Sequence, residues 1–170
     1  MAHITDQTIG MVALGNIARA VARKAQAFGM KVIAYDPYVQ PWIAKEYRVE
    51  LVAELEELAS RSDFISIHPP LNNQTRHLIR ASFFKSIKPS SYFINTCRGP
   101  TVDEESLIAA LKDHELAGAG LDVFDVEPTD ASNPLFQMDN VIVTPHSAGG
   151  STRAGIAAQV QVGQECARLL

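Results

Sequence analysis

Short apolar runs alternate with longer segments of helical periodicity along the whole chain. We expect strands at residues 9–12, 31–35, 64–67, 92–95, 117–121 and 141–143, with a shorter one near 49–51. The segments with helical spacing are 16–28, 52–60, 82–87, 103–112 and 152–170. This alternation of strand and helix predicts a parallel sheet that is covered by helices on both faces.

The expected fold is therefore a doubly wound α/β domain of the Rossmann type, with six or seven strands and a single unit over residues 1–170. In the first helix, the spacing of Ile17, Ala20, Val21, Ala25 and Phe28 predicts one face packed against the sheet. In the last helix, an apolar or small face follows at the same period. Its members are Ile156, Val160, Gly163, Ala167 and Leu170.

Composition narrows the class of protein. Hydrophobic residues make up 46% of the 170 residues and the formal net charge is −4, with a pI of about 5.7. Without a basic run, nucleic acid is not an expected partner, and no apolar run approaches the roughly 20 residues that span a membrane. The first residues do not resemble a signal peptide, and Cys97 and Cys166 are too few for a disulfide framework. We expect a cytoplasmic protein with reduced thiols. The histidines and acids show no metal-ligand spacing.

A small-residue turn between the first strand and the first helix points to a phosphate-binding site. The segment ALGNIA at 13–18 places Ala13, Gly15 and Ala18 where a dinucleotide fingerprint has its three glycines. Gly15 permits close approach to phosphates, whereas Ala13 departs from the pattern at the tight turn. Asp36 follows the second strand, where a carboxylate reaches the ribose hydroxyls of NAD and repels the 2′-phosphate of NADP. An ordinary strand–helix turn is the alternative.

Polar side chains also follow four strands of the second half: His68, Arg98, Asp122 and His146. The carboxyl ends of parallel strands lie along one edge of a sheet, which is the edge where ligands bind. Arg98 offers a fork that suits a carboxylate. His146 exchanges protons near neutral pH, and Glu127 could hydrogen-bond its imidazole and favour the charged form. With a nicotinamide cofactor, this set predicts interconversion of a 2-hydroxy acid and a 2-oxo acid.

Several motifs, in order, resemble the D-isomer-specific 2-hydroxyacid dehydrogenase family over nearly the full chain. They are ALGNIA at 13–18, YDPY at 35–38, IHPPL at 67–71 with Thr75 and Arg76, INTCRG at 94–99 with VDE at 102–104, GLDVF at 120–124 with Glu127 and Pro128, and VTPHSAG at 143–149. The resemblance implies NAD as cofactor. It also implies that Arg98 binds the substrate carboxylate, that His146 is the acid/base and that Glu127 is its partner.

The resemblance and the turn together predict a set of cofactor contacts along the same edge. These are Leu14, Gly15, Asn16, Ile17, Asp36, Pro37, His68, Pro69, Pro70, Thr75, Thr96, Cys97, Arg98, Asp122, His146, Ala148 and Gly149. Cys97 stands where the family often has another small residue, so we interpret it as a packing substitution.

The resemblance covers only the cofactor half of a two-lobed enzyme, because the family's substrate lobe is missing from this sequence. We therefore expect an excised domain, a fragment or a truncated product, with a small 2-hydroxy or 2-oxo acid as substrate of the full-length enzyme. Two other functions stay open: a stand-alone NAD(H)-binding or interaction module without turnover, and a Rossmann domain for another adenosine cofactor such as a methyl donor. In the family this domain usually supplies dimer contacts, so a homodimer is a further expectation.

Overall fold

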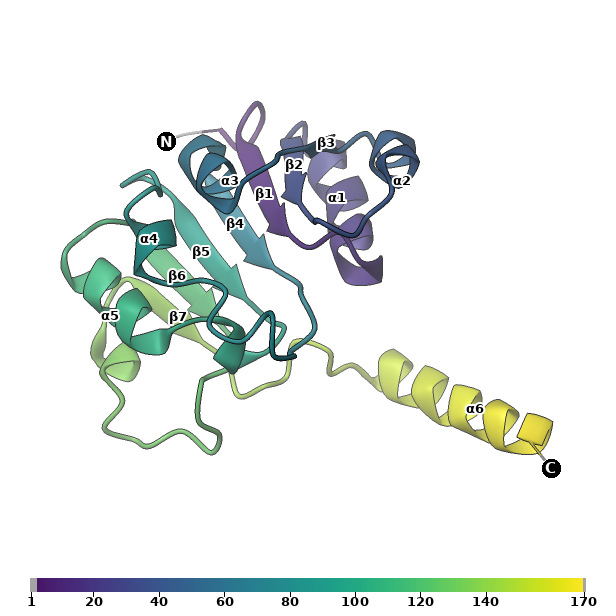
Figure 1. Ribbon diagram of the computed structural model, residues 1–170. Coiled ribbons are helices and arrows are strands. Elements are labelled where there is room, and N and C mark those ends of the chain that lie inside the picture. Colours follow the sequence, from purple (N-terminus) through teal and green to yellow (C-terminus); the bar gives the residue numbers. More distant parts are fainter. Residues whose placement is uncertain (1–2, 170) are drawn as a thin grey trace.

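The computed structural model describes residues 3–169, and a seven-stranded, all-parallel sheet forms its centre in the order β3-β2-β1-β4-β5-β6-β7 (Figure 1). The strands are β1 Thr8–Val12, β2 Lys31–Tyr35, β3 Glu50–Leu51, β4 Phe64–Ile67, β5 Tyr92–Asn95, β6 Gly118–Leu121 and β7 Val141–Val143. The parallel sheet and all seven predicted strands are thus confirmed.

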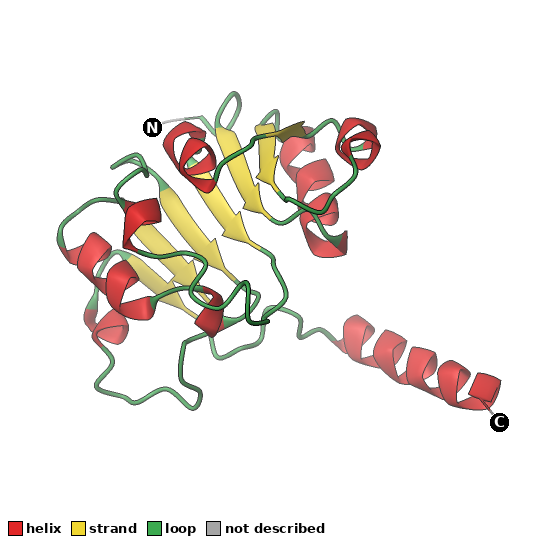
Figure 2. Ribbon diagram, viewed as in Figure 1, coloured by secondary structure: helices red, strands yellow, loops and turns green. Residues whose placement is uncertain are grey.

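Helices connect the strands and cover the two faces of the sheet (Figure 2). They are α1 Asn16–Ala27, α2 Pro41–Glu46, α3 Leu55–Arg61, α4 Ala81–Phe84, α5 Glu104–Lys112 and α6 Thr152–Leu169, with short 3-10 turns at Gly99–Thr101 and Pro134–Gln137. Helix α2 was not predicted, because its single buried residue, Ala44, leaves no periodic apolar pattern to detect.

Successive strand residues enter two separate cores, as the alternation of side chains in a strand requires. Met11 packs with α1 and α2, whereas the neighbouring Val12 packs with a larger cluster that includes Leu58 of α3 and Phe83 of α4. The predicted face of α1 is wrong in part. Ala18, Ala22 and Ala25 are buried, while Ile17 and Phe28 are 68% and 63% exposed. Small residues face the sheet because the helix lies close to it.

The strand register aligns the carboxyl ends of six strands at one level. Val12 pairs with both Tyr35 and Ile67, and the same level continues through Asn95, Leu121 and Val143. The residues that follow these strands therefore lie along one edge. The chain leaves β1 toward β2 on one side and later returns to β4 on the other, so the strand order reverses between β1 and β4. Ligands of open α/β sheets bind at such a reversal.

Helix α6 projects from this edge and has no buried residue among those described (Figure 1). Ile156 and Val160, which belong to the predicted apolar face, are 59% and 53% exposed. Leu170, the last member of that face, lies outside the described residues. None of the helices described is both long and apolar enough to cross a membrane.

Candidate functional site

The turn after β1 has the geometry of a phosphate-binding loop, with one strained residue. Ala13 has a φ of +69°, in the left-handed region that favours glycine. Its N–H donates to the carbonyl of Tyr35, which fixes the turn to the end of β2. The alanine at the first fingerprint position therefore adopts the conformation that a glycine would adopt without strain.

Gly15 is required by neither backbone conformation nor packing. Its φ is −74°, and a Cβ added there would meet nothing within 4 Å. It directly precedes α1, whose first-turn N–H groups point out of the helix toward any group bound there. The open space above Gly15 is thus suited to a close approach of phosphate oxygens to the backbone.

Asp36 holds the two sides of the turn together. Its Oδ2 accepts the N–H of Leu14 at 2.8 Å, and its Oδ1 accepts the N–H groups of Tyr38 and Val39 at 2.9 and 3.0 Å. The carboxylate is half-buried and lines a pocket of about 320 Å³. The pocket is lined by Val12, Ala13, Tyr35, Asp36, Pro37, Tyr38, Pro69, Pro70, Asn72, Gln74, Thr75 and Leu78. We call this space the β2–β4 pocket, after the strands whose following segments line it; it contains five of the predicted cofactor contacts.

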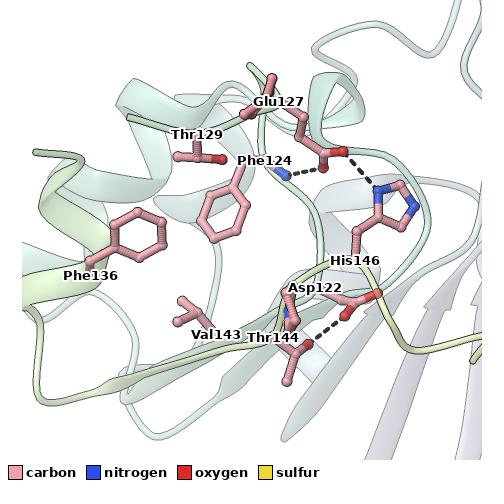
Figure 3. A pocket seen from close by; sticks show the side chains of 10 residues that line it. Asp122, Phe124, Glu127, Thr129, Phe136, Val143, Thr144 and His146 are labelled. Carbon is pink, nitrogen blue, oxygen red and sulfur yellow. Dashed lines mark hydrogen bonds and ion pairs between the residues drawn. The ribbon is translucent and has the colours of Figure 1, made fainter. Parts of the chain in front are cut away.

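At the other end of the same edge, His146 and Glu127 form the predicted pair. The imidazole Nδ1 lies 2.8 Å from Glu127 Oε2 (Figure 3). Glu127 Oε1 accepts the N–H of Phe124 at 3.0 Å. That backbone hydrogen bond, more than the nearby His146 and Arg98, holds the pKa of the Glu127 carboxyl below its usual range. Glu127 is therefore ionised at neutral pH and accepts from Nδ1–H, which leaves Nε2 for exchange of a proton.

A buried carboxylate holds the turn that presents His146. Asp122, 3% exposed, accepts hydrogen bonds from the Thr144 hydroxyl and from the N–H groups of Ser147 and Ala148. Burial alone would raise the pKa of Asp122, but these three hydrogen bonds and the neighbouring His146 lower it. His146 sits within this clasped turn with a φ of +51°, a conformation that a non-glycine residue keeps only when its surroundings fix it.

These residues surround a second pocket, of about 470 Å³. Phe124, Phe136 and Val143 form its apolar wall, while Glu127 and His146 form its rim (Figure 3). The Nε2 atom of His146 points away from this apolar wall (Figure 3). The pocket therefore lies on the side of the imidazole ring away from Nε2. A group that exchanges a proton with Nε2 would lie on the opposite side of the ring, outside this pocket.

Arg98 is exposed, and its backbone is held by two residues that sequence reasoning missed. The Arg98 carbonyl accepts from Asn95 Nδ2 at 3.1 Å and from the Thr101 hydroxyl at 2.6 Å. Asn95 and Thr101 are 2% and 0% exposed. A Cβ on the neighbouring Gly99 would lie 1.8 Å from the Phe124 carbonyl, so this loop packs directly on the segment that leads to Glu127. Asn95 ends β5 with a polar side chain, which is the signal that could have identified it.

Two further predicted residues have buried functional groups. Burial lowers the pKa of His68 to about 4, so its imidazole is neutral at physiological pH, and its Nε2 is buried with no hydrogen-bond partner among the described residues. Burial also raises the pKa of the Cys97 thiol, which argues against a nucleophilic role. Cys97 and Cys166 are both free.

The other predicted cofactor contacts lie along the same edge. Asn16, Thr96, Ala148 and Gly149 are exposed, as is Ile17 at the start of α1. Leu14 is buried, and its N–H is already donated to Asp36. Direct contact of each residue with a cofactor stays a prediction. Among residues 3–169, no group of three or more His, Cys, Asp or Glu side chains could hold a metal ion.

Comparison with known proteins identifies the domain. Residues 1–148 match the family described as D-isomer specific 2-hydroxyacid dehydrogenase, NAD binding domain. The chain is 40% identical to D-3-phosphoglycerate dehydrogenase of Methanocaldococcus jannaschii over 168 residues, which are 99% of this chain and 32% of that protein. It is 45% identical to (S)-sulfolactate dehydrogenase of Chromohalobacter salexigens over 150 residues, which are 88% of this chain and 48% of that protein.

A solved structure supports the same assignment. The NAD-complexed D-isomer specific 2-hydroxyacid dehydrogenase of Lactobacillus delbrueckii ssp. bulgaricus superposes with a TM-score of 0.83 at 35% identity, covering 95% of this chain and 53% of that one. The chain thus spans about a third to a half of the length of these relatives. The motifs, the fold and these matches together show that the chain belongs to the D-isomer specific 2-hydroxyacid dehydrogenase family and forms its NAD-binding domain.

Proposed function

We propose that this chain is the cofactor-binding half of an NAD-dependent dehydrogenase that interconverts a small 2-hydroxy acid and the corresponding 2-oxo acid. The observation that carries the proposal is the His146–Glu127 pair, 2.8 Å apart, on the same sheet edge as the turn that precedes α1. A proton carrier and a dinucleotide site on one edge are what hydride transfer to a carbonyl requires.

The residues of the chain would divide the work as follows. The space above Gly15 receives the pyrophosphate at the start of α1, and Asp36 receives the ribose hydroxyls. The nicotinamide of the bound cofactor supplies or accepts the hydride. Arg98 holds the substrate carboxylate through its guanidinium. His146 donates a proton from Nε2 to the carbonyl oxygen in reduction, and removes it from the hydroxyl in oxidation.

Glu127 makes this proton exchange effective. Its ionised carboxylate fixes the Nδ1–H tautomer and stabilises the imidazolium that exists when Nε2 carries a proton. Asp122 keeps the turn in place, so that the imidazole of His146 is already oriented before the substrate binds.

The experiment is a turnover assay with NADH and a panel of 2-oxo acids: glyoxylate, hydroxypyruvate, pyruvate and phenylpyruvate. The chain is assayed alone and fused to the remaining half of a relative. Oxidation of NADH that is lost in His146→Ala but retained in His114→Ala would support the proposal. A fusion that binds NADH and turns over none of these acids would contradict it.

A second candidate is a stand-alone NAD(H)-binding module without turnover. The observation that favours it is that the open space above Gly15 and the half-buried Asp36 carboxylate both belong to this domain alone. Saturable NADH binding by the chain, with turnover only in the fusion, would support this candidate for the chain as it stands.

A further inference from the structure

A hydrogen bond spans the β2–β4 pocket from one wall to the other. In the sheet β1 lies between β2 and β4, so Val12 and Ala13 form the floor of the pocket, and the segments that follow β2 and β4 form its walls. Tyr38 belongs to the first wall and Gln74 to the second. The Tyr38 hydroxyl donates to Gln74 Oε1 at 2.8 Å, which closes a ring of protein around the pocket.

Both ends of this bond are held by hydrogen-bonded turns. On one side, Asp36 Oδ1 accepts the N–H groups of Tyr38 and Val39. On the other, Asn72 Oδ1 accepts the N–H groups of Gln74 and Thr75 at 2.8 and 3.0 Å. The bond therefore joins two hydrogen-bonded backbone segments, although Tyr38 itself is 74% exposed. Solvent reaches the ring freely, so packing does not account for its position.

We propose that Tyr38 and Gln74 form a strap that controls entry and exit of the adenosine end of the cofactor. The proposal rests on the proposed function, in which this pocket takes the adenosine of NAD. The strap is already closed in the ligand-free protein, and it closes again over a bound base. The hydrogen bond must break before the cofactor enters and again before it leaves. Because the bond is present in both the free and the bound protein, breaking it costs the same free energy in each. The strap therefore slows association and dissociation alike and leaves the equilibrium affinity nearly unchanged.

The test is Tyr38→Phe, which keeps the aromatic ring and removes the hydroxyl that makes the bond. Stopped-flow fluorescence would measure NADH association and dissociation. Loss of one such hydrogen bond should raise both rate constants by roughly two- to tenfold, with Kd changed by less than about twofold. Tyr47→Phe is the matched control, because the Tyr47 hydroxyl also makes one side-chain hydrogen bond, with Arg23 at 3.0 Å, away from the pocket. It should leave both rate constants unchanged.

A double-mutant cycle shows whether Tyr38 and Gln74 act through each other. Gln74→Met removes the amide at similar length, and it should reproduce the Tyr38→Phe rates. The double variant should match either single variant instead of multiplying their effects. ADP-ribose, displaced by NADH, should show the same acceleration, whereas nicotinamide mononucleotide, which has no adenosine, should not.

Three results would contradict the proposed role of Tyr38 and Gln74. Unchanged rates in Tyr38→Phe would mean that the base enters by another route. Faster dissociation alone, with weaker binding, would make Tyr38 a direct contact of the base. Absence of binding of both NADH and ADP-ribose to the wild-type chain would refute the cofactor site itself, and the strap with it. Normal wild-type binding combined with the first or second result would refute the strap only.

Discussion

Two aspartates occupy equivalent places at the two ends of the site, and they differ in what they leave free. Asp36 follows β2 and Asp122 follows β6, and each accepts three hydrogen bonds from the turns around it. Asp36 is half-buried and lines an open pocket, whereas Asp122 is 3% exposed. Asp36 is thus able both to hold its turn and to meet a ligand, while Asp122 is committed to the turn that carries His146.

Because Asp36 both holds a turn and lines an open pocket, its substitution would not separate the two roles. Removing the Asp36 carboxylate would release Leu14 and Tyr38 as well as any ribose contact, so loss of NAD binding would have two explanations. Gly15 offers a cleaner test, because a Cβ added there meets no protein atom within 4 Å and would occupy the space proposed for the phosphates.

The largest expected effect is on turnover. In a fusion that carries the rest of a relative, His146→Ala should lower kcat by about 10²–10⁴-fold, the usual contribution of general acid/base catalysis. Asp36→Asn, at the other end, should act mainly on the KM for NAD. Steady-state kinetics separate the two. A kcat near that of the wild type in His146→Ala would remove this residue from the mechanism.

A large effect on stability is expected for Asp122→Asn. An asparagine amide cannot accept all three hydrogen bonds, and it places N–H against N–H in a buried site, at a cost of about 2–4 kcal/mol. Urea denaturation would measure the free energy of unfolding. Asp130→Asn is the control, since Asp130 also accepts from a neighbour, Ser132, but is exposed; it should change the free energy of unfolding far less than Asp122→Asn does. Equal losses in the two variants would contradict the role assigned to Asp122.

The pH dependence of stability tests the buried His68 between the two ends. The pKa of His68 is about 4 in the folded chain and 6.5 in an unfolded one, so the unfolded chain takes up the proton first. Stability should therefore fall as pH drops from 6.5 toward 4, by about 1.4 kcal/mol per pH unit from this residue.

The measurement is urea denaturation at pH 7 and pH 4.5 for the wild type and His68→Gln. Protonation of the acids whose pKa values are lowered in the fold, such as Asp122 and Glu127, also lowers the free energy of unfolding at acidic pH. This contribution is the same in the wild type and in the variant. The variant should lose about 2 kcal/mol less than the wild type over this interval. An identical loss would show that the His68 imidazole is protonated in the fold.

The smallest expected effect is at Ala13. Glycine would relieve the positive φ, and this gain exceeds its entropic cost, so Ala13→Gly should stabilise the fold by up to about 1 kcal/mol. Ala20→Gly, at an exposed position within α1, should destabilise by roughly the same amount. Thermal denaturation would give both signs. Calorimetry on the first variant would also show whether a relaxed turn binds NAD more tightly, as we expect.

Much of the fold could be predicted from the sequence because parallel strands leave near-continuous apolar runs. The edge of the sheet that carries the site could also be predicted from the sequence, since the residues that follow parallel strands lie along one edge. The face of α1 could not be predicted, because alanines and larger apolar residues share the same period. Close approach of helix and sheet, which selects Ala18 and Ala22 over Ile17, is a property of the packed structure.

The contact between His146 and Glu127 was predictable because its chemistry is tied to residue type, whereas the catalytic roles of these two residues and of Arg98 stay predictions. The residues that hold this chemistry in place were not predictable, because Asn95 and Thr101 act through the Arg98 carbonyl and carry no reactive group. The hydrogen bond between Tyr38 and Gln74 could not be predicted either, since its partners are 36 residues apart in sequence.

The most direct test of the account is NADH binding to the 170-residue chain, measured by fluorescence titration for the wild type, Gly15→Val and Gly163→Val. A Cβ at either glycine meets nothing within 4 Å, so both variants should fold, which circular dichroism would check. We expect saturable binding in the wild type and Gly163→Val, and its loss in Gly15→Val. Equal binding in all three proteins, or no binding in any of them, would contradict it.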